Sequence, residues 1–102
     1  MPAMDLTIFA RFHARPGQAA AVEAALRDVV PKSRAEPGCL GIEAHRSIQD
    51  PDLFFIHSRW LDVAAFERHA ELPHTVRFVA AVTAAIDHPL EVARAQPLDP
   101  PV

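Results

Sequence analysis

The segment FFIHSRWLDVAAFERHAELPH, residues 54–74, surrounds the only tryptophan of the chain with side chains that could move a proton. Imidazole is the side chain that gains and loses a proton near neutral pH. His57 lies inside an apolar run, where it could act as a base or only form a hydrogen bond in the core. His74 begins a predicted helix, whose positive dipole end favours a neutral, proton-accepting imidazole, although His74 could equally cap that helix. Either histidine is therefore a candidate general base.

Trp60 joins a large apolar ring system to a single N–H donor. At the end of a strand, such a side chain either anchors a core or an interface, or orients a bound ligand through its indole N–H. Both interpretations stay open on the sequence alone. Arg59 has the opposite parity, so we expect it on the other face of the sheet, in an ion pair with a second chain.

The hydrophobic spacing predicts the elements that position these side chains. Alternating apolar residues over 4–14 indicate a strand, and helical spacing over 18–34 indicates a helix that should kink or end near Pro31. Two further strands are predicted over 40–48 and 53–61, joined as a hairpin. In this hairpin, His45 would pair with His57 if Ile48 lies opposite Phe54.

A second helical region follows the hairpin. Asp62 is a good N-cap for a short helix whose Val63 and Phe66 should face inward, and Pro73 should end that helix. The next helical run has apolar residues at Val76, Val79, Val82 and Ile86. A fourth strand is predicted over 90–95. The order strand, helix, strand, strand, helix, strand predicts an α+β, ferredoxin-like fold with an antiparallel sheet.

Composition narrows the class of protein. The chain has 102 residues, which fits one domain over 1–102, with a core over about 4–96 and a proline-rich tail over 97–102. Its formal net charge of -3 gives no basic surface for nucleic acid. One cysteine cannot form an internal disulfide, and no run is long and apolar enough for a membrane span or has the layout of a signal peptide. We therefore expect a cytoplasmic protein with a small-molecule or protein partner.

Three segments, ARFHARPGQ, SRAEPGCLGIEAHRS and FFIHSRWLDVAAFERHAELPH, together resemble the antibiotic biosynthesis monooxygenase domain. The resemblance covers about residues 4–96. It implies that two subunits pack sheet against sheet as a homodimer, a dimeric α/β barrel. Strands with hydrophobic residues on both faces agree with this expectation, because helices would cover only one face of the sheet. The third strand of the family often reads Tyr-Glu-Arg-Trp, where this chain has His57 and Ser58 in place of the first two residues.

The resemblance also implies a reaction, the oxidation of a quinol, an anthrone or another electron-rich aromatic compound by molecular oxygen without a cofactor. Such a protein must bind a ring system, remove a proton and exclude water. On this reading His74 or His57 is the base and Trp60 orients a substrate oxygen. The ring-binding residues would be Phe9, Phe12, Phe54, Phe66 and Phe78. The alternative is a binding protein of the same fold that is not catalytic or that processes a signalling molecule.

Metal and haem sites are not expected from the sequence. Haem-degrading relatives combine an asparagine, a tryptophan and an iron-ligating histidine, and this chain contains no asparagine. His45, His57 and His69 are spaced by twelve residues on different predicted elements, and no short two-ligand motif supports a zinc site.

Overall fold

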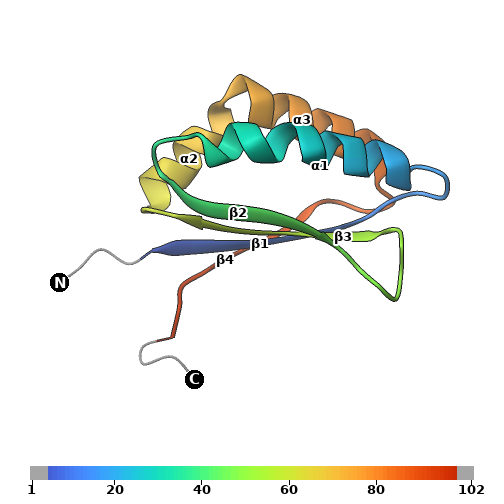
Figure 1. Ribbon diagram of the computed structural model, residues 1–102, viewed down its shortest axis with the longest axis horizontal. Helices are drawn as coiled ribbons and strands as arrows, with labels where there is room; N and C mark the ends of the chain where they lie inside the picture. The colour runs from blue at the N-terminus through green and yellow to red at the C-terminus, as the bar shows by residue number, and fades with distance from the viewer. Residues whose placement is uncertain (1–4, 99–102) are drawn as a thin grey trace.

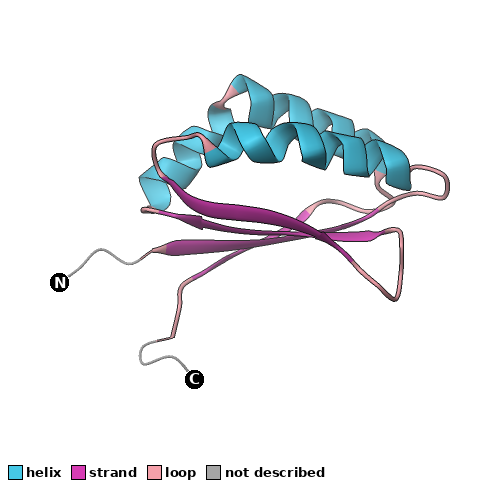
Figure 2. Cartoon of the chain, in the orientation of Figure 1, coloured by secondary structure: helices cyan, strands magenta, loops and turns pink. Residues whose placement is uncertain are grey.

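Four antiparallel strands form one sheet, and three helices lie together over one of its faces (Figures 1 and 2). The computed structural model describes residues 5–98. The strand order in the sheet is β2-β3-β1-β4. Along the chain the elements are β1 (Leu6–His13), α1 (Ala19–Arg34), β2 (Cys39–Arg46), β3 (Leu53–Trp60), α2 (Val63–Glu71), α3 (Pro73–Ala85) and β4 (Glu91–Ala95).

This order confirms the predicted α+β, ferredoxin-like fold, with each predicted strand and helix at its place in the chain. The ends of the strands and of α1 differ from the predicted ends by at most two residues, because fraying and capping shift such boundaries. Residues 99–102 of the predicted proline-rich tail lie outside the described residues. No helix in the described part of the chain is long and apolar enough to cross a membrane.

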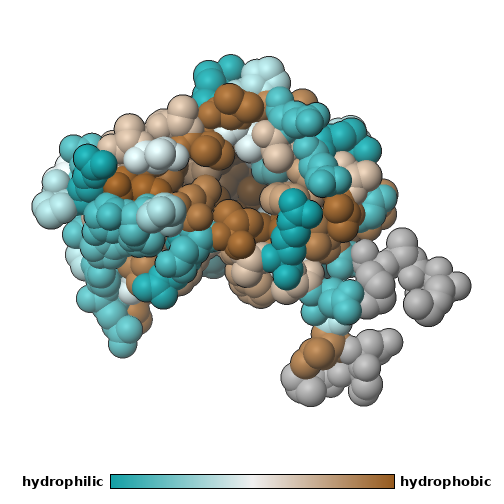
Figure 3. All heavy atoms as spheres, turned by 180° about the vertical axis from the view of Figure 1, so that it is seen from behind, coloured by the Kyte–Doolittle hydropathy of each residue, from teal (hydrophilic) through white to brown (hydrophobic). Residues whose placement is uncertain are grey.

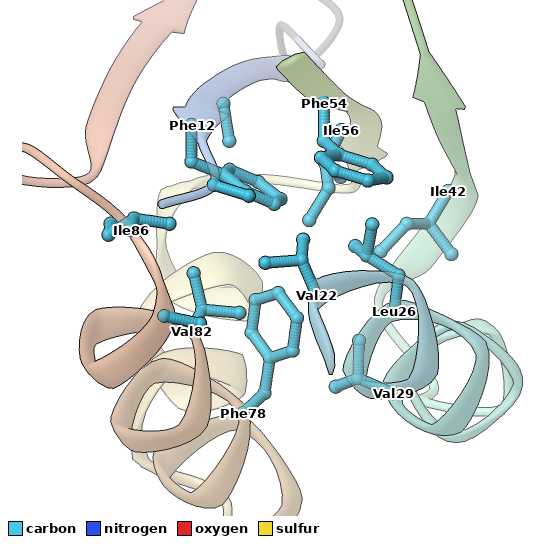
Figure 4. Close-up of a cluster of buried hydrophobic side chains, with 13 residues drawn as sticks. Phe12, Val22, Leu26, Val29, Ile42, Phe54, Ile56, Phe78, Val82 and Ile86 are labelled. Atoms are coloured by element: carbon cyan, nitrogen blue, oxygen red, sulfur yellow. The ribbon is translucent and has the colours of Figure 1, made fainter. Parts of the chain in front are cut away.

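The main core lies between the sheet and the helices. On β1, Ile8, Ala10 and Phe12 point to the helices and are buried, whereas Phe9 and Arg11 point to the opposite face and are exposed. Figure 4 shows Phe12 and Phe54 from the sheet pointing towards Val22 of α1 and Phe78 of α3. Strand alternation thus divides this sheet into a covered face and an open face.

Pro31 lies inside α1, and the helix continues past it for three residues to Arg34. The ring lies on the exposed side of the helix, where its effect on packing is small. The carbonyl of Pro31 still accepts the N–H of Ala35 at 3.3 Å. The helix was predicted to kink or end near Pro31; it passes through Pro31 and ends three residues later, at the predicted residue 34.

The inward face of α2 differs in part from the predicted face, and only part of the apolar run of α3 is buried. Asp62 caps α2 as predicted, since its carboxylate accepts the N–H of Ala65 at 2.8 Å. Val63, however, is 46% exposed, because the buried stripe of α2 runs through Ala65 and Val63 lies two residues before it, on the far side of the helix. On α3 the buried residues are Thr75, Phe78, Val82 and Ala85, whereas Val76 and Val79 of the predicted apolar run are exposed.

The register of the hairpin also differs from the predicted pairing. His45 lies opposite Phe55, and His57 lies opposite Glu43. The pairing of His45 with His57 is therefore wrong by two residues. The turn sets this register, because Ser47 accepts hydrogen bonds from the backbone of Gln49 and Asp50 and holds Ile48 outside the ladder.

Gly38 lets α2 approach the segment between α1 and β2. A Cβ atom at Gly38 would overlap the Cβ atom of Ala65, whereas Gly41 has open space at the same position. The N–H of Leu61 donates to the carbonyl of Gly38 at 2.9 Å, which fixes this segment against the end of β3. The absence of a side chain at Gly38 therefore brings α2 next to Glu36.

Candidate active site

Three side chains from separate segments meet beside α2. Glu36 precedes β2, His69 lies near the end of α2, and His74 lies in the first turn of α3. One oxygen of Glu36, Oε2, lies 2.9 Å from Nδ1 of His69 and 2.7 Å from Nε2 of His74. Their side chains are only 10%, 13% and 17% exposed. A part-buried carboxylate thus holds two imidazole rings.

The carboxylate decides which nitrogen of each ring carries a proton. An ionised carboxylate can only accept hydrogen bonds, so Nδ1 of His69 and Nε2 of His74 must both be protonated. In the neutral His69 ring, Nε2 then carries a lone pair. No hydrogen bond to this Nε2 occurs within the described residues. His69 is therefore arranged to accept a proton at Nε2.

Trp60 supports this ring from behind. Its side chain is fully buried, and its ring centroid lies 4.4 Å from that of His69. The indole N–H donates to the hydroxyl of Ser58 at 3.0 Å. Ser58 and Trp60 are two residues apart on β3 and point to the same side of the sheet. The indole donor is thus committed to Ser58.

A cavity of about 230 Å³ lies between the sheet and the helices, beside this cluster. Figure 3 shows a hollow surrounded by hydrophobic residues on the side opposite to that of Figure 1. The apolar part of the wall includes Ile8, Ile56, Phe66, Phe78, Leu90 and Val92. Its polar side chains are Ser33, Ser58, His69 and Thr75. His69 is the one ionisable side chain in this wall among the described residues.

The structure places the predicted site residues in four different settings. Phe66 and Phe78 lie in the cavity wall, while Trp60 and His74 lie next to His69 but outside that wall. Phe12 and Phe54 are buried in the main core. Phe9 and His57 stack on each other, with ring centroids 5.1 Å apart, on the open face of the sheet.

His69 and Glu36 were not singled out from the sequence as a possible base and its partner. A signal for His69 existed, because it follows Phe66 by three residues on the same helix and so shares its inward side. No local signal marks Glu36, which lies 33 residues before His69 in the chain. Only the tertiary structure brings this carboxylate to the two rings.

Two groups of side chains in the described residues are compact enough to hold a metal ion. One is Glu36, His69 and His74, and the other is His13, Asp50 and Asp52. His45, His57 and His69, whose equal spacing was not taken as a zinc site, form no such group among the described residues. In the first group, two nitrogens lie at hydrogen-bond distance from a single oxygen, a geometry that favours protons between these atoms.

Two further grooves lie outside the cavity. One of about 610 Å³ runs between α1 and β2 and is lined by charged residues that include Glu23, Arg27 and Arg34. Another, of about 400 Å³, lies on the open face of the sheet beside Phe9, Phe55 and His57. Both are more open than the cavity between the sheet and the helices, and His57 therefore contacts a different space from His69.

Comparison with known proteins shows the same fold and family. The structure of PA3566 from Pseudomonas aeruginosa has 36% sequence identity and a TM-score of 0.89, over 96% of this chain and 98% of that chain. The structure of Rv0793 from Mycobacterium tuberculosis has 27% identity and a TM-score of 0.88, over 93% and 96% of the two chains.

Sequence comparison gives the same result. The protein named "Putative monooxygenase Rv0793" is 29% identical over 94 residues, which are 92% of each chain. The family model described as antibiotic biosynthesis monooxygenase matches residues 5–81, a segment that includes Glu36, Trp60, His69 and His74. This chain belongs to the antibiotic biosynthesis monooxygenase family.

Proposed function

We propose that this protein binds a small, electron-rich aromatic compound in the cavity and oxidises it with molecular oxygen. Membership of the antibiotic biosynthesis monooxygenase family supports a monooxygenase. The observation that carries the proposal is the position of His69, a lone ionisable group among the described residues of a largely apolar cavity wall. Quinols and anthrones are the favoured substrates, because such rings become good electron donors once a proton is removed.

His69 acts as the general base in this proposal. Its Nε2 accepts the proton of a substrate hydroxyl, while its Nδ1–H stays hydrogen-bonded to Glu36. The negative charge of Glu36 stabilises the imidazolium ion that forms. The N–H of His74 holds the same carboxylate oxygen, so His74, first predicted as a base, becomes a positioning residue. Trp60 is also a positioning residue, since its ring packs against that of His69 at an interplanar angle of 35°.

The atoms of the reaction balance without a bound group. In a quinol, a phenolic O–H bond breaks, its proton goes to His69, and the electron pair stays on the substrate oxygen. In an anthrone, the proton comes from a C–H bond of the ring CH2, and the electron pair is delocalised onto the carbonyl oxygen. The electron-rich ring then reduces dioxygen. In an anthrone, the ring CH2 carbon gains one oxygen atom as a carbonyl, and its two hydrogens leave with the other oxygen atom as water. In a quinol, a ring C–H gains a hydroxyl oxygen, and two phenolic hydrogens leave as water.

The cavity wall suits such a ring. Phe66 and Phe78 offer aromatic surfaces, and the aliphatic residues around them exclude water from the charged intermediates. The remaining predicted ring-binding residues have other surroundings. Phe12 and Phe54 are buried in the main core between the sheet and the helices, and Phe9 lies on the open face of the sheet.

Oxygen consumption tests the proposal. The metal-free protein with menadiol or anthrone should consume oxygen faster than the compound alone. His69→Gln should lower the turnover about 10²-fold or more, the usual effect of losing a positioned base. His57→Gln is the matched control, because His57 lies on the open face, and it should keep most of the turnover. Equal loss in both variants would contradict the assignment of His69.

The alternative function is a small-ligand binding protein of the same fold without a catalytic step. If the protein binds these aromatic compounds in the cavity but consumes no oxygen with any of them, the oxidation proposal fails and the alternative holds. Displacement of a fluorescent naphthol from the protein measures this binding independently of turnover.

We also propose that the partner of this chain is a second copy of itself. The open sheet face carries Phe9, which is 52% exposed, next to the half-buried Phe55 and His57. A sheet face of this kind is suited to packing against its own copy about a two-fold axis. Arg59 was predicted to form an ion pair with a second chain. Within its own chain Arg59 donates to Asp5 at 2.8 Å, so its guanidinium group needs no partner from a second chain.

A cytoplasmic location is the remaining part of this proposal. The single cysteine, Cys39, cannot form an internal disulfide, which fits a reducing compartment. Fractionation of cells that express a tagged chain would test the location.

A further inference from the structure

Ser33 is a buried hydroxyl group that the fold itself does not use. It lies in the last turn of α1, its side chain is fully buried, and it forms part of the cavity wall. Its Oγ atom has no hydrogen-bond partner within the described residues, and no other buried side-chain nitrogen or oxygen there lacks one. Leaving such a group without a partner costs free energy of folding.

A serine in a helix has an easy way to avoid this cost. It can donate to the backbone carbonyl four residues earlier, which here belongs to Val29. Ser33 does not form this bond. An alanine would fill the position without a polar atom and has a higher helix propensity. The hydroxyl therefore lowers the stability of the folded protein unless a ligand in the cavity forms a hydrogen bond with it.

Each of the other polar side chains of the wall already has at least one hydrogen-bond partner. Ser58 accepts the indole N–H of Trp60, and Thr75 lies 3.3 Å from Nδ1 of His69. His69 is held by Glu36 and keeps only Nε2 free. Among the described residues of the wall, the polar side-chain atoms without any partner are Nε2 of His69 on α2 and Oγ of Ser33 on α1.

We infer that Ser33 binds a second oxygen substituent of the substrate, away from the hydroxyl that gives its proton to His69. This inference rests on the proposed function, because it assumes that the cavity takes an aromatic ring. A hydroxyl can donate to a carbonyl oxygen or accept from a second phenol. Ser33 is then the residue that selects rings with two oxygen substituents over rings with one.

The size of the cavity limits the ring system. A dry cavity of about 150 Å³ is known to hold a benzene molecule. The volume of about 230 Å³ therefore suits one ring or two fused rings with their substituents. Among the proposed substrates, a one-ring or two-ring diol fits better than a three-ring anthrone.

Anaerobic calorimetry tests the inference without turnover. The probes are 1,4-dihydroxynaphthalene and 1-naphthol, which differ in one hydroxyl group. Ser33→Ala should weaken binding of the diol about tenfold, or about 1.4 kcal/mol, and should change binding of 1-naphthol less than about twofold. The same variant should unfold at an equal or higher urea concentration than the wild type, because an unpaired buried hydroxyl has been removed. Thr83→Ala, an exposed change on α3, should alter neither quantity.

The possible results separate this inference from the proposed function. If the wild type binds the diol but consumes no oxygen, the oxidation proposal fails and the role of Ser33 stands. Equal weakening of both probes in Ser33→Ala would overturn the role of Ser33, and so would a loss of stability with unchanged binding. Failure of both probes to bind the wild type at millimolar concentration would overturn it as well.

Discussion

At the scale of single residues, two polar side chains on one strand satisfy each other next to the cavity. Ser58 and Trp60 are both buried, and the indole N–H of Trp60 is donated to Ser58. The sequence left open whether Trp60 anchors a core or contacts a ligand. The structure places Trp60 in a small core cluster with Leu6, Ile8 and Ala65. Its contact with His69 connects that cluster to the proposed site.

The bond between Trp60 and Ser58 predicts a pattern in stability. Ser58→Ala leaves a buried N–H without an acceptor and should lower the free energy of unfolding by about 1–3 kcal/mol. Trp60→Phe removes that donor but also removes packing. The double variant should therefore lose less than the sum of the two single variants, by about 0.5–1.5 kcal/mol. Urea denaturation of the four proteins measures the difference, and strict additivity would contradict the bond.

At the scale of elements, Gly38 controls how closely α2 approaches the segment that carries Glu36. Helix α2 holds His69, and the contact between Gly38 and Ala65 determines its distance from that segment. The two halves of the Glu36–His69 pair come from opposite sides of this contact. The distance between His69 and Glu36 thus depends on Gly38, which has no side chain and no part in the proposed reaction.

In Gly38→Ala the new Cβ would overlap the Cβ of Ala65, which cannot rotate away. The change should therefore move α2 outward and lower the free energy of unfolding by about 1–3 kcal/mol. Turnover should fall with it, because His69 moves away from Glu36. Gly41→Ala is the matched control, with open space around the new Cβ, and should change stability little. Adding Ala65→Gly to Gly38→Ala should restore activity in part. A stable, fully active Gly38→Ala protein would disprove the close approach.

A second link between elements depends on pH. His13, at the end of β1, lies 2.7 Å from Asp87 in the α3–β4 connection and 2.9 Å from Asp50 in the hairpin turn. The hydrogen bond to Asp87 raises the pKa of His13 above its ordinary 6.5. A backbone N–H from Asp52 lowers the pKa of Asp50, and the hydrogen bond to His88 lowers the pKa of Asp87.

The signs of these shifts define a pH window. The raised pKa of His13 stabilises the fold fully below pH 6.5, and this contribution is lost as pH rises through the pKa of the folded state. The lowered pKa values of Asp50 and Asp87 stabilise the fold above their ordinary 3.8 and are lost on acidification. The urea midpoints of wild type and His13→Gln should therefore differ most near pH 5 and converge at alkaline pH. A difference that grows with pH would contradict this link.

At the scale of the whole molecule, the helices cover one face of the sheet and leave the other open (Figure 1). The proposed homodimer would cover the open face, with an interface of about 2,000 Å² or more as in obligate homodimers. One chain of 11.2 kDa would then appear at twice that mass. In this dimer each chain is proposed to be a single domain over residues 1–102, with its core over about 4–96.

Light scattering tests the homodimer. The wild type should have the mass of two chains at micromolar concentration, and Phe9→Glu should shift it to one chain, because a charge would be buried at the centre of the open face. Val76→Glu is the control, since Val76 is 54% exposed on the helical layer. A wild type that stays at the mass of one chain on concentration would exclude the interface.

The sequence by itself determined the elements and their order, because strand alternation, helical spacing and capping are local properties of the chain. Asp62 and Pro73 correctly predicted where α2 begins and where it gives way to α3, and the alternation over 4–14 predicted β1 to within two residues. The family also followed from local motifs. The inward faces of the helices did not follow, since Val76 and Phe78 are both apolar and only packing against α1 and the sheet selects Phe78.

The tertiary structure alone decided the site. The carboxylate of Glu36 lies 33 residues from His69 and 38 residues from His74 in the chain, and no local pattern connects them. The sequence allowed Trp60 to be a ligand contact or an anchor. In the structure its N–H donates to Ser58 and its ring packs against His69, so Trp60 supports His69. Alternation puts His57 and Ser58 on opposite faces of β3, but the packing of the helices decides which face is covered. His57 therefore lies on the open face, and His69 borders the cavity. Contacts between distant segments select which of several chemically suitable side chains share a cavity, and periodicity cannot encode that choice.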